Sequence, residues 1–268
     1  MRQRLFLCQA VLITFASALA AAPAREDDHR QEELRKRFFD LRCSMGCDSI
    51  AQLPFRLATQ TVDVFKAPEN QRTLGIGLAV ALLAIPSDDD VRFSLAETQT
   101  LGRHRDSVFE VGDIGGSRLG TFGAAGALYG IGLLTDRPQL KSTGKQAAEA
   151  LLLTNLFVAG VKQAVRRQRP DGSDRQSFPS GHTANAFTLA SVIHQNHGLK
   201  TALPAYAFAT FVAYSRINDD RHFLSDVILG AAVGITIGRT VSLFHKKHMK
   251  VAPLLGRHTR GLLVSLDF

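Results

Sequence analysis

Two basic residues after an apolar segment could hold an anion. Lys162 and Arg169 stand seven positions apart in the run KQAVRRQRP, so one helix through both would carry them on nearly the same face. Pro170 disfavours helix at Arg169 and would leave its guanidinium at the helix end. A lysine and an arginine fork together suit phosphate oxygens, although cations at a helix end usually only complement the helix dipole.

The stretch PSGH at 179–182 predicts the start of a helix that faces the same anion. Ser180 is a good N-cap residue, and Gly181 allows a ligand to approach the backbone. The free N–H groups of a first helical turn attract anions, and His182 lies in that turn. These residues predict a phosphate with an imidazole beside it.

A third stretch, SRINDDRHFLSD at 215–226, adds a second histidine. Ser215 and Arg216 end one apolar segment, and His222 opens the next, with Asp226 four positions on. On a helix, this carboxylate can accept a hydrogen bond from one imidazole nitrogen, which leaves the other nitrogen free to attack. Each stretch alone is more often structural, but the three in this order favour phosphoryl chemistry.

The three stretches resemble the signature of the type 2 phosphatidic acid phosphatase (PAP2) and vanadium haloperoxidase superfamily. That signature is Lys-x6-Arg-Pro, Pro-Ser-Gly-His and Ser-Arg-x5-His-x3-Asp, and the resemblance covers about residues 150–240. It implies a metal-independent phosphohydrolase without a cofactor, built on a helical bundle. His222 would form a phosphohistidine, Asp226 would hold its ring, and His182 would act as acid and base. The implied phosphate-binding residues are Lys162, Arg169, Ser180, Gly181 and Arg216.

The expected substrate is a phosphomonoester or a diphosphate. The apolar segments beside the motifs favour a lipid-linked one, such as phosphatidic acid, an isoprenyl diphosphate or a lipopolysaccharide phosphate. Three alternatives stay open. A vanadium-dependent haloperoxidase would use the same residues, since vanadate mimics the phosphoryl transition state. A soluble periplasmic acid phosphatase would have broad specificity, and a non-catalytic phospholipid binder or envelope scaffold would need no paired acid and nucleophile.

Six apolar segments rich in Ala and Leu must position these residues, and their composition favours helices over strands. The predicted fold is therefore all-α, a bundle of about six core helices in a domain over 71–248, with a short extended or hairpin tail at 249–268. Residues 88–90 are expected to form a solvated turn. Glycines at 126 and 130, and at 230, 234 and 238, indicate close helix packing. The apolar segments are 74–85, 119–134, 150–161, 184–193, 202–213 and 227–237.

The N-terminus predicts export. Residues 1–24 have the charged, apolar and small-residue parts of a secretory signal peptide, with an uncleaved anchor as the alternative. Residues 25–70 follow as a charged extension. Cleavage would remove Cys8 and leave Cys43 and Cys47, a pair that an oxidising compartment favours as a small disulfide.

Charge and segment length bear on partners and location. The formal net charge is +8, yet no basic stripe interleaved with aromatics is present, so nucleic acid is not an expected partner. Most apolar segments fall short of the ~20 residues of a spanning helix, so the bundle could span the membrane, touch it, or be soluble in the periplasm. If it spans, the basic loops 136–145, 197–200 and 246–250 lie in the cytoplasm and the motifs face the periplasm. The oligomeric state is left open.

Overall fold

The structure is a computed structural model, and it describes residues 53–98, 104–247, 249–255 and 260–266. The predicted signal peptide, the Cys43–Cys47 pair and most of the charged extension lie outside the described residues. Gln60–Asp267 forms one compact unit, and all that follows concerns this unit and the helix that leads into it.

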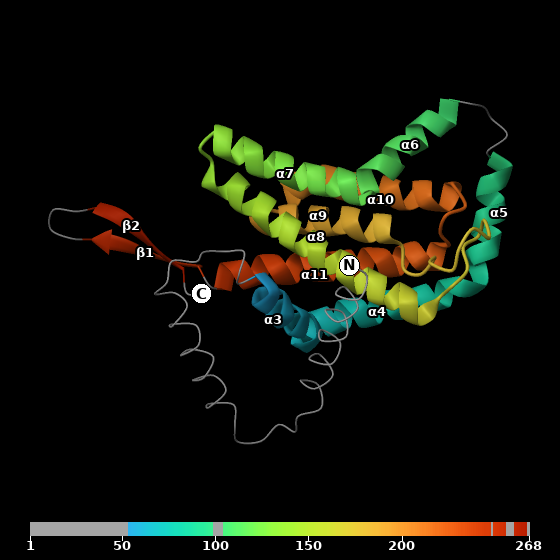
Figure 1. The fold of residues 1–268 in the computed structure, drawn as a ribbon, viewed down its shortest axis with the longest axis horizontal. Coiled ribbons are helices and arrows are strands. Elements are labelled where there is room, and N and C mark those ends of the chain that lie inside the picture. The colour runs from blue at the N-terminus through green and yellow to red at the C-terminus, as the bar shows by residue number, and fades with distance from the viewer. Residues whose placement is uncertain (1–52, 99–103, 248, 256–259, 267–268) are drawn as a thin grey trace, which may run out of the picture. The chain divides into compact units, whose positions relative to one another are not determined.

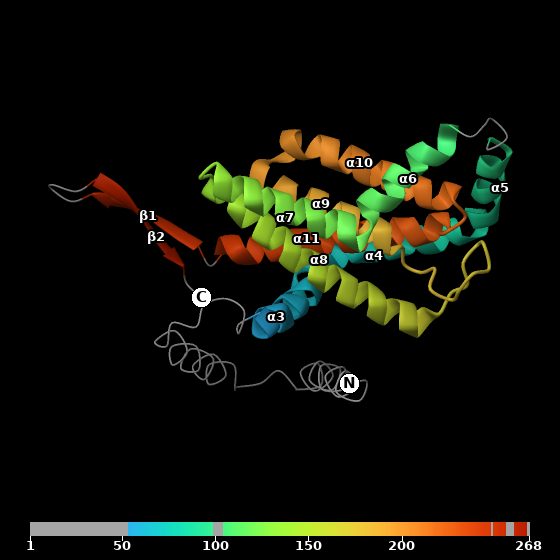
Figure 2. The ribbon, with the colours of Figure 1, turned by 45° about the horizontal axis from the view of Figure 1, so that its top comes forward.

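A bundle of helices builds the compact unit (Figures 1 and 2). Helix α9 packs against α8, α10 and α11, while α7 lies against α8 and α4 against α11. Each of these helices overlaps one of the six predicted apolar segments, so the all-α prediction is confirmed. The bounds are α4 (Pro68–Ala84), α7 (Arg118–Leu134), α8 (Pro138–Val165), α9 (Gly181–His197), α10 (Leu199–Asn218) and α11 (Leu224–Lys247).

Three further helices are additions to the predicted set. They are α3 (Leu53–Lys66), α5 (Asp88–Thr98) and α6 (His104–Gly116), and the short 3₁₀ turn η1 (Ile85–Ser87) joins α4 to α5. Part of α3 packs in the bundle, because Gln60 is fully buried and donates to Glu149 of α8 (3.0 Å). The compact unit therefore includes residues on the N-terminal side of position 71.

The expected solvated turn at 88–90 was wrong. These three aspartates form the first turn of α5, where negative charge complements the helix dipole. Asp89 and Asp90 are exposed, but Asp88 is buried. Its carboxylate finds charged and polar partners on other elements, so burial does not leave it unpaired.

The tail forms a hairpin, one of the two forms predicted for it. Strands β1 (Met249–Leu255) and β2 (Arg260–Leu266) pair antiparallel, with Met249 opposite Leu266 and Leu255 opposite Arg260. The expected alternation of the tail thus corresponds to a two-stranded ladder.

Only some of the predicted glycines bring helices together. A Cβ on Gly238 of α11 would lie 2.7 Å from the carbonyl oxygen of Thr188 and 2.8 Å from Cβ of Ser191, both on α9. A Cβ on Gly126 of α7 would meet nothing within 4 Å. Close approach therefore marks the contact between α9 and α11, which carries both histidine motifs.

We expect Gly238→Ala to lower the free energy of unfolding by about 1–3 kcal/mol, because the added methyl would press α11 away from the α9 backbone. The matched change Gly126→Ala should raise it by about 0.5–1 kcal/mol, since alanine favours a helix over glycine. Thermal unfolding of both variants in the same detergent or buffer measures the difference. Equal shifts would contradict the packing described here.

The motif residues gather at one end of the bundle. Successive antiparallel helices bring together the end of α8, the start of α9, the end of α10 and the start of α11. The junction of α6 and α7 lies at this end too, because a Cβ on Gly116 would be 3.0 Å from Cβ of His182. Five elements can therefore contribute side chains to one site.

Candidate active site

The loop after α8 carries Arg169 into the site. Arg166 ends α8 in the left-handed region (φ 51°), and its N–H bonds the carbonyl of Lys162. Arg169 therefore lies beyond the helix, and the prediction that it shares a helix face with Lys162 was wrong. Its Nε donates to Asp174 (2.8 Å) and its Nη1 to the carbonyl of Arg221 (3.1 Å), so the loop and the turn before α11 are joined by this guanidinium.

Lys162 remains on the last turn of α8. Its Nζ donates to the carbonyls of Gln176 and Ser177, which lie further along the same loop. The ammonium thus orders the loop that follows it and adds a positive charge next to Arg169.

The start of α9 has the local structure that the sequence predicts. Ser180 is fully buried and caps the helix, since its side chain accepts from Thr183. Its own N–H donates to the backbone carbonyl of Asp226 (3.0 Å), which ties α9 to the start of α11. Gly181 and His182 form the first turn, where N–H groups have no acceptor inside the helix.

His222 lies in the turn before α11 and is only 3% exposed. Its Nε2 is 3.4 Å from Nη1 of Arg169, and its Nδ1 is 3.5 Å from Oδ2 of Asp226, a distance long for a hydrogen bond. The pKa of His222 is lowered to about 4, mainly by burial, and the charges of Lys162 and Arg169 act in the same direction while Asp226 opposes them. The imidazole is therefore neutral near pH 7, as a nucleophile requires.

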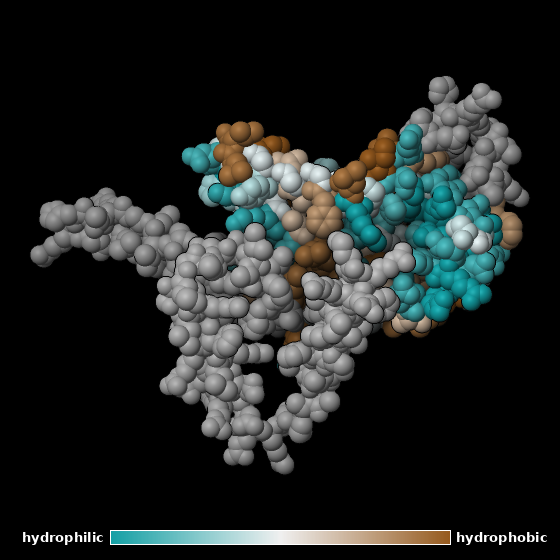
Figure 3. Space-filling view, viewed as in Figure 1, coloured by the Kyte–Doolittle hydropathy of each residue, from teal (hydrophilic) through white to brown (hydrophobic). Residues whose placement is uncertain are grey.

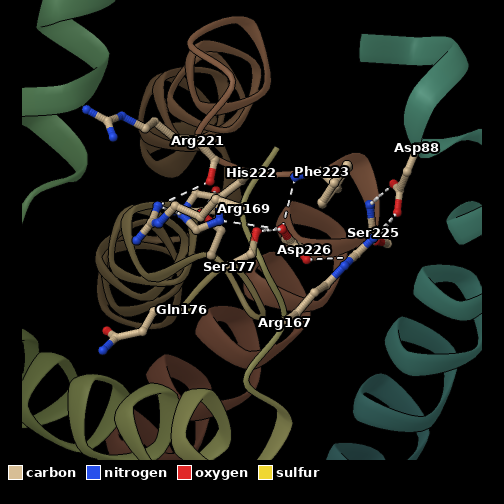
Figure 4. A network of polar contacts seen from close by, with 12 residues as sticks. Asp88, Arg167, Arg169, Gln176, Ser177, Arg221, His222, Phe223, Ser225 and Asp226 are labelled. Atoms are coloured by element: carbon tan, nitrogen blue, oxygen red, sulfur yellow. Dashed lines mark hydrogen bonds and ion pairs between the residues drawn. The ribbon is translucent and has the colours of Figure 1, made fainter. Parts of the chain in front are cut away.

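Asp226 is fully buried at the centre of a polar network (Figure 4). Its Oδ2 accepts from the hydroxyl of Ser177 and the N–H of Phe223 (2.9 Å), and its Oδ1 accepts from Nη1 of Arg167 (2.8 Å). Ser177 and Arg167 are absent from the predicted site residues. Their contacts fix the carboxylate next to His222.

Arg167 connects this carboxylate to a second one on α5. Its Nη2 donates to Asp88 (2.7 Å), and its guanidinium lies 4.2 Å from the ring centroid of Phe223. Asp88 also accepts from the N–H (2.9 Å) and the hydroxyl (2.6 Å) of Ser225, at the start of α11. Figure 4 shows this chain of contacts from His222 through Asp226 to Asp88.

His182 and Arg216 share a carboxylate from α6. Asp113 Oδ1 lies 3.0 Å from Nε2 of His182 and also accepts from Nη1 of Arg216. Arg216 is buried at the end of α10, and its Nη2 donates to Asp219 (2.6 Å). The sequence analysis assigned no role to Asp113 or Asp219.

Some of the same charges affect the pKa values of both His182 and His222. The pKa of His182 is lowered to about 4, mainly by burial and next by the charge of Arg216, while Asp113 opposes both. His222 and Arg169 also lower it, although they belong to the other motifs. The structure thus brings the three predicted motifs into one electrostatic environment.

The charges of the site suit an anion better than a metal ion. Within the described ranges, no group of three or more His, Cys, Asp and Glu side chains is placed to hold a metal ion. Lys162, Arg169 and Arg216 instead converge on the space near the two imidazoles, where helix α9 begins. Cations at a helix N-terminus form an anion-binding arrangement.

Comparison with known proteins agrees with these motifs. Residues 144–250 match the family model described as the PAP2 superfamily. Over these residues, the chain is similar to the PAP2 superfamily. The matched residues contain most of α8 and the whole of α9, α10 and α11, and so include every predicted catalytic and phosphate-binding residue.

Several relatives of this chain have described activities. It is 43% identical over 104 residues to a lipid A 1-phosphatase of Porphyromonas gingivalis, which covers 37% of this chain and 23% of that protein. It is 27% identical over 99 residues to a lipid A 4'-phosphatase of Helicobacter pylori, covering 33% and 50%. The chain thus spans at most half the length of these two relatives. The crystal structure of Aquifex aeolicus LpxE matches with 26% identity and a TM-score of 0.49, covering 59% of this chain and 94% of that one.

Proposed function

We propose that this chain is a phosphoric-ester hydrolase that removes phosphate from lipid phosphates through a phosphohistidine. The observation that carries the proposal is the buried, neutral His222, whose Nε2 lies beside the guanidinium of Arg169. A phosphate held by Arg169 would place its phosphorus within reach of this nitrogen.

The chemistry follows from the positions of the two imidazoles. Nε2 of His222 attacks phosphorus, and the bond to the leaving oxygen breaks as His182 gives that oxygen a proton. Water then attacks the phosphohistidine while His182 takes a proton from it, which releases inorganic phosphate and restores both rings. Phosphate binding adds negative charge next to His182, so the pKa of His182 rises in the complex and allows it to act as an acid.

The basic residues supply the charge that phosphoryl transfer needs. Lys162, Arg169 and Arg216 would neutralise the equatorial oxygens, together with Ser180 and the N–H of Gly181 at the start of α9. The proposed mechanism therefore draws its electrostatic stabilisation from protein groups alone.

Apolar surface next to the site supports a lipid substrate. Leu83 near the end of α4 is 78% exposed, and Leu119 at the end of α7 that faces the site is 87% exposed. Figure 3 shows hydrophobic residues over the helices and hydrophilic ones near the loop that carries Arg169. By length and composition, Pro138–Val165 and Leu224–His245 could cross a membrane. The names of the two bacterial relatives also point to lipid phosphates.

We further propose that the site faces the periplasm of a membrane-associated, exported protein. The basic stretches are 136–145 at the start of α8, 197–200 at the junction of α9 and α10, and 246–250, whose described residues belong to the end of α11 and the start of β1. All three lie away from the site end. The positive-inside rule would keep these stretches in the cytoplasm and leave the site outside.

A substrate panel tests the proposal. We expect the full chain in detergent micelles to release phosphate from phosphatidic acid or lipid A faster, by about 10-fold or more in kcat/KM, than from p-nitrophenyl phosphate, because remote apolar contacts add binding energy in the transition state. Equal turnover of the soluble ester would favour a broad-specificity phosphatase. Peroxide-dependent halide oxidation with added vanadate, in place of inhibition by vanadate, would favour the haloperoxidase.

A further inference from the structure

Helix α6 places the carboxylate of Asp113 next to His182, the histidine of the PSGH motif. A Cβ on Gly112 would lie 2.8 Å from Cβ of Ser215 on α10, and a Cβ on Gly116 would lie 3.0 Å from Cβ of His182 on α9. These glycines come one position before and three positions after Asp113, so α6 is seated closely on both helices at this point. Helix packing therefore fixes the α6 backbone on both sides of Asp113, and the side chain of Asp113, which is 54% exposed, reaches His182 from this backbone.

Asp113 contacts two neighbours, His182 and Arg216, through one carboxylate oxygen. Its Oδ1 lies 3.0 Å from Nε2 of His182, and the same oxygen accepts from Nη1 of Arg216. A carboxylate on Nε2 holds the proton there and leaves Nδ1 as the nitrogen that can exchange one. Asp113 thus stands to His182 as Asp226 stands to His222.

We propose that Asp113 is a positioning residue for His182, an assignment that rests on the proposed hydrolase function. Asp113 fixes Nε2–H, so Nδ1 is the atom that transfers protons. In the first step Nδ1–H protonates the leaving oxygen as its bond to phosphorus breaks. In the second, Nδ1 takes a proton from the water whose oxygen attacks phosphorus. Asp113 stays ionised throughout, so the balance of protons involves only His182, the leaving group and water.

Removal of the negative charge of Asp113 changes the pKa of His182 in a definite direction. The groups that face His182 are Arg216 from α10, Arg169 from the loop after α8, His222 from the turn before α11, and Asp113 itself. All but Asp113 lower the pKa of His182. Asp113→Asn would lower the pKa of His182 further, so a smaller fraction of its imidazole would be protonated at a given pH. Protonation of a poor leaving group would then be slower.

A rival role for Asp113 is to neutralise Arg216 while the site is empty. Asp219 offers a matched control, because it also pairs with Arg216 (2.6 Å) and is the residue directly after α10 rather than a residue of α6. Asp113→Asn and Asp219→Asn each remove one carboxylate from Arg216. Only the first removes the partner of His182.

The experiment compares leaving groups in the full chain, using p-nitrophenyl phosphate and an alkyl phosphate of similar length. We expect Asp113→Asn to lower kcat for the alkyl phosphate by about 10- to 100-fold, because the alkoxide needs a proton and nitrophenolate does not. The decrease for the nitrophenyl ester should stay under about 3-fold. Asp113→Glu should recover part of the loss, and the alkaline limb of the pH profile should move to lower pH in Asp113→Asn.

Two results would overturn the assignment. One is an equal loss of kcat on both esters, and the other is a change in KM alone that matches the change in Asp219→Asn. These results are separate from failure of the proposed function, which would appear as no phosphate release by the unmodified chain on either ester. If the unmodified chain is active and the leaving-group difference is missing in Asp113→Asn, the hydrolase remains and the positioning role is rejected.

Discussion

His222→Ala is expected to reduce phosphate release by more than about 10⁴-fold, because the variant has no group to form the covalent intermediate. The remaining cations could still bind the substrate, so KM should change less than kcat. A radiolabelled substrate, stopped in base after one turnover, should label the unmodified protein and leave the variant unlabelled, since phosphohistidine survives base.

His197→Gln provides the control for this result. His197 lies at the opposite end of α9 from His182, where its Nε2 is 2.9 Å from the hydroxyl of Thr143, so it belongs to no part of the site. The control should keep both activity and labelling. Retention of a few per cent of activity in His222→Ala would show that water attacks phosphorus directly, and the phosphohistidine route would be rejected.

We expect Asp88→Ala to lower the free energy of unfolding by about 3 kcal/mol or more, the largest loss from any single substitution in the buried polar network around Asp226. It removes one carboxylate from the buried end of Arg167 and removes the group that accepts from the N–H of Ser225 at the start of α11. Breaking such a pair and losing a helix cap each destabilise a fold. Because Arg167 also bonds Asp226, the variant should lose activity at temperatures where it is still folded.

Asp89→Ala is the matched change, since Asp89 is the next residue on α5 and is exposed. We expect its unfolding temperature and phosphate release to stay close to those of the unmodified chain. Thermal unfolding and activity measured on both variants in one detergent separate the two positions. Equal effects would contradict the buried network of Asp88.

The sequence by itself determined six of the helices and the order of the motifs. Runs of Ala and Leu between polar turns make each apolar segment helical whatever packs beside it, and the cap at Ser180 starts α9 from local interactions alone. The motif residues then follow at fixed distances along the chain. Helix content and the candidate residues Lys162, Arg169, Arg216 and the two histidines could therefore be predicted.

Apart from Asp226, only the tertiary structure decided which acids serve the site. Asp174 contacts its arginine from nearby in the chain, but Asp88 reaches Arg167 from α5, and Asp113 reaches His182 from α6. Asp88 and its neighbour Asp89 look alike in sequence, and only one is buried. Contacts between residues far apart along the chain leave no periodic pattern, because they depend on how helices pack and not on local backbone preference. For the same reason, the left-handed end of α8 and the difference between the glycines of α11, which approach α9 closely, and Gly126 of α7, which does not, emerged only from the folded bundle.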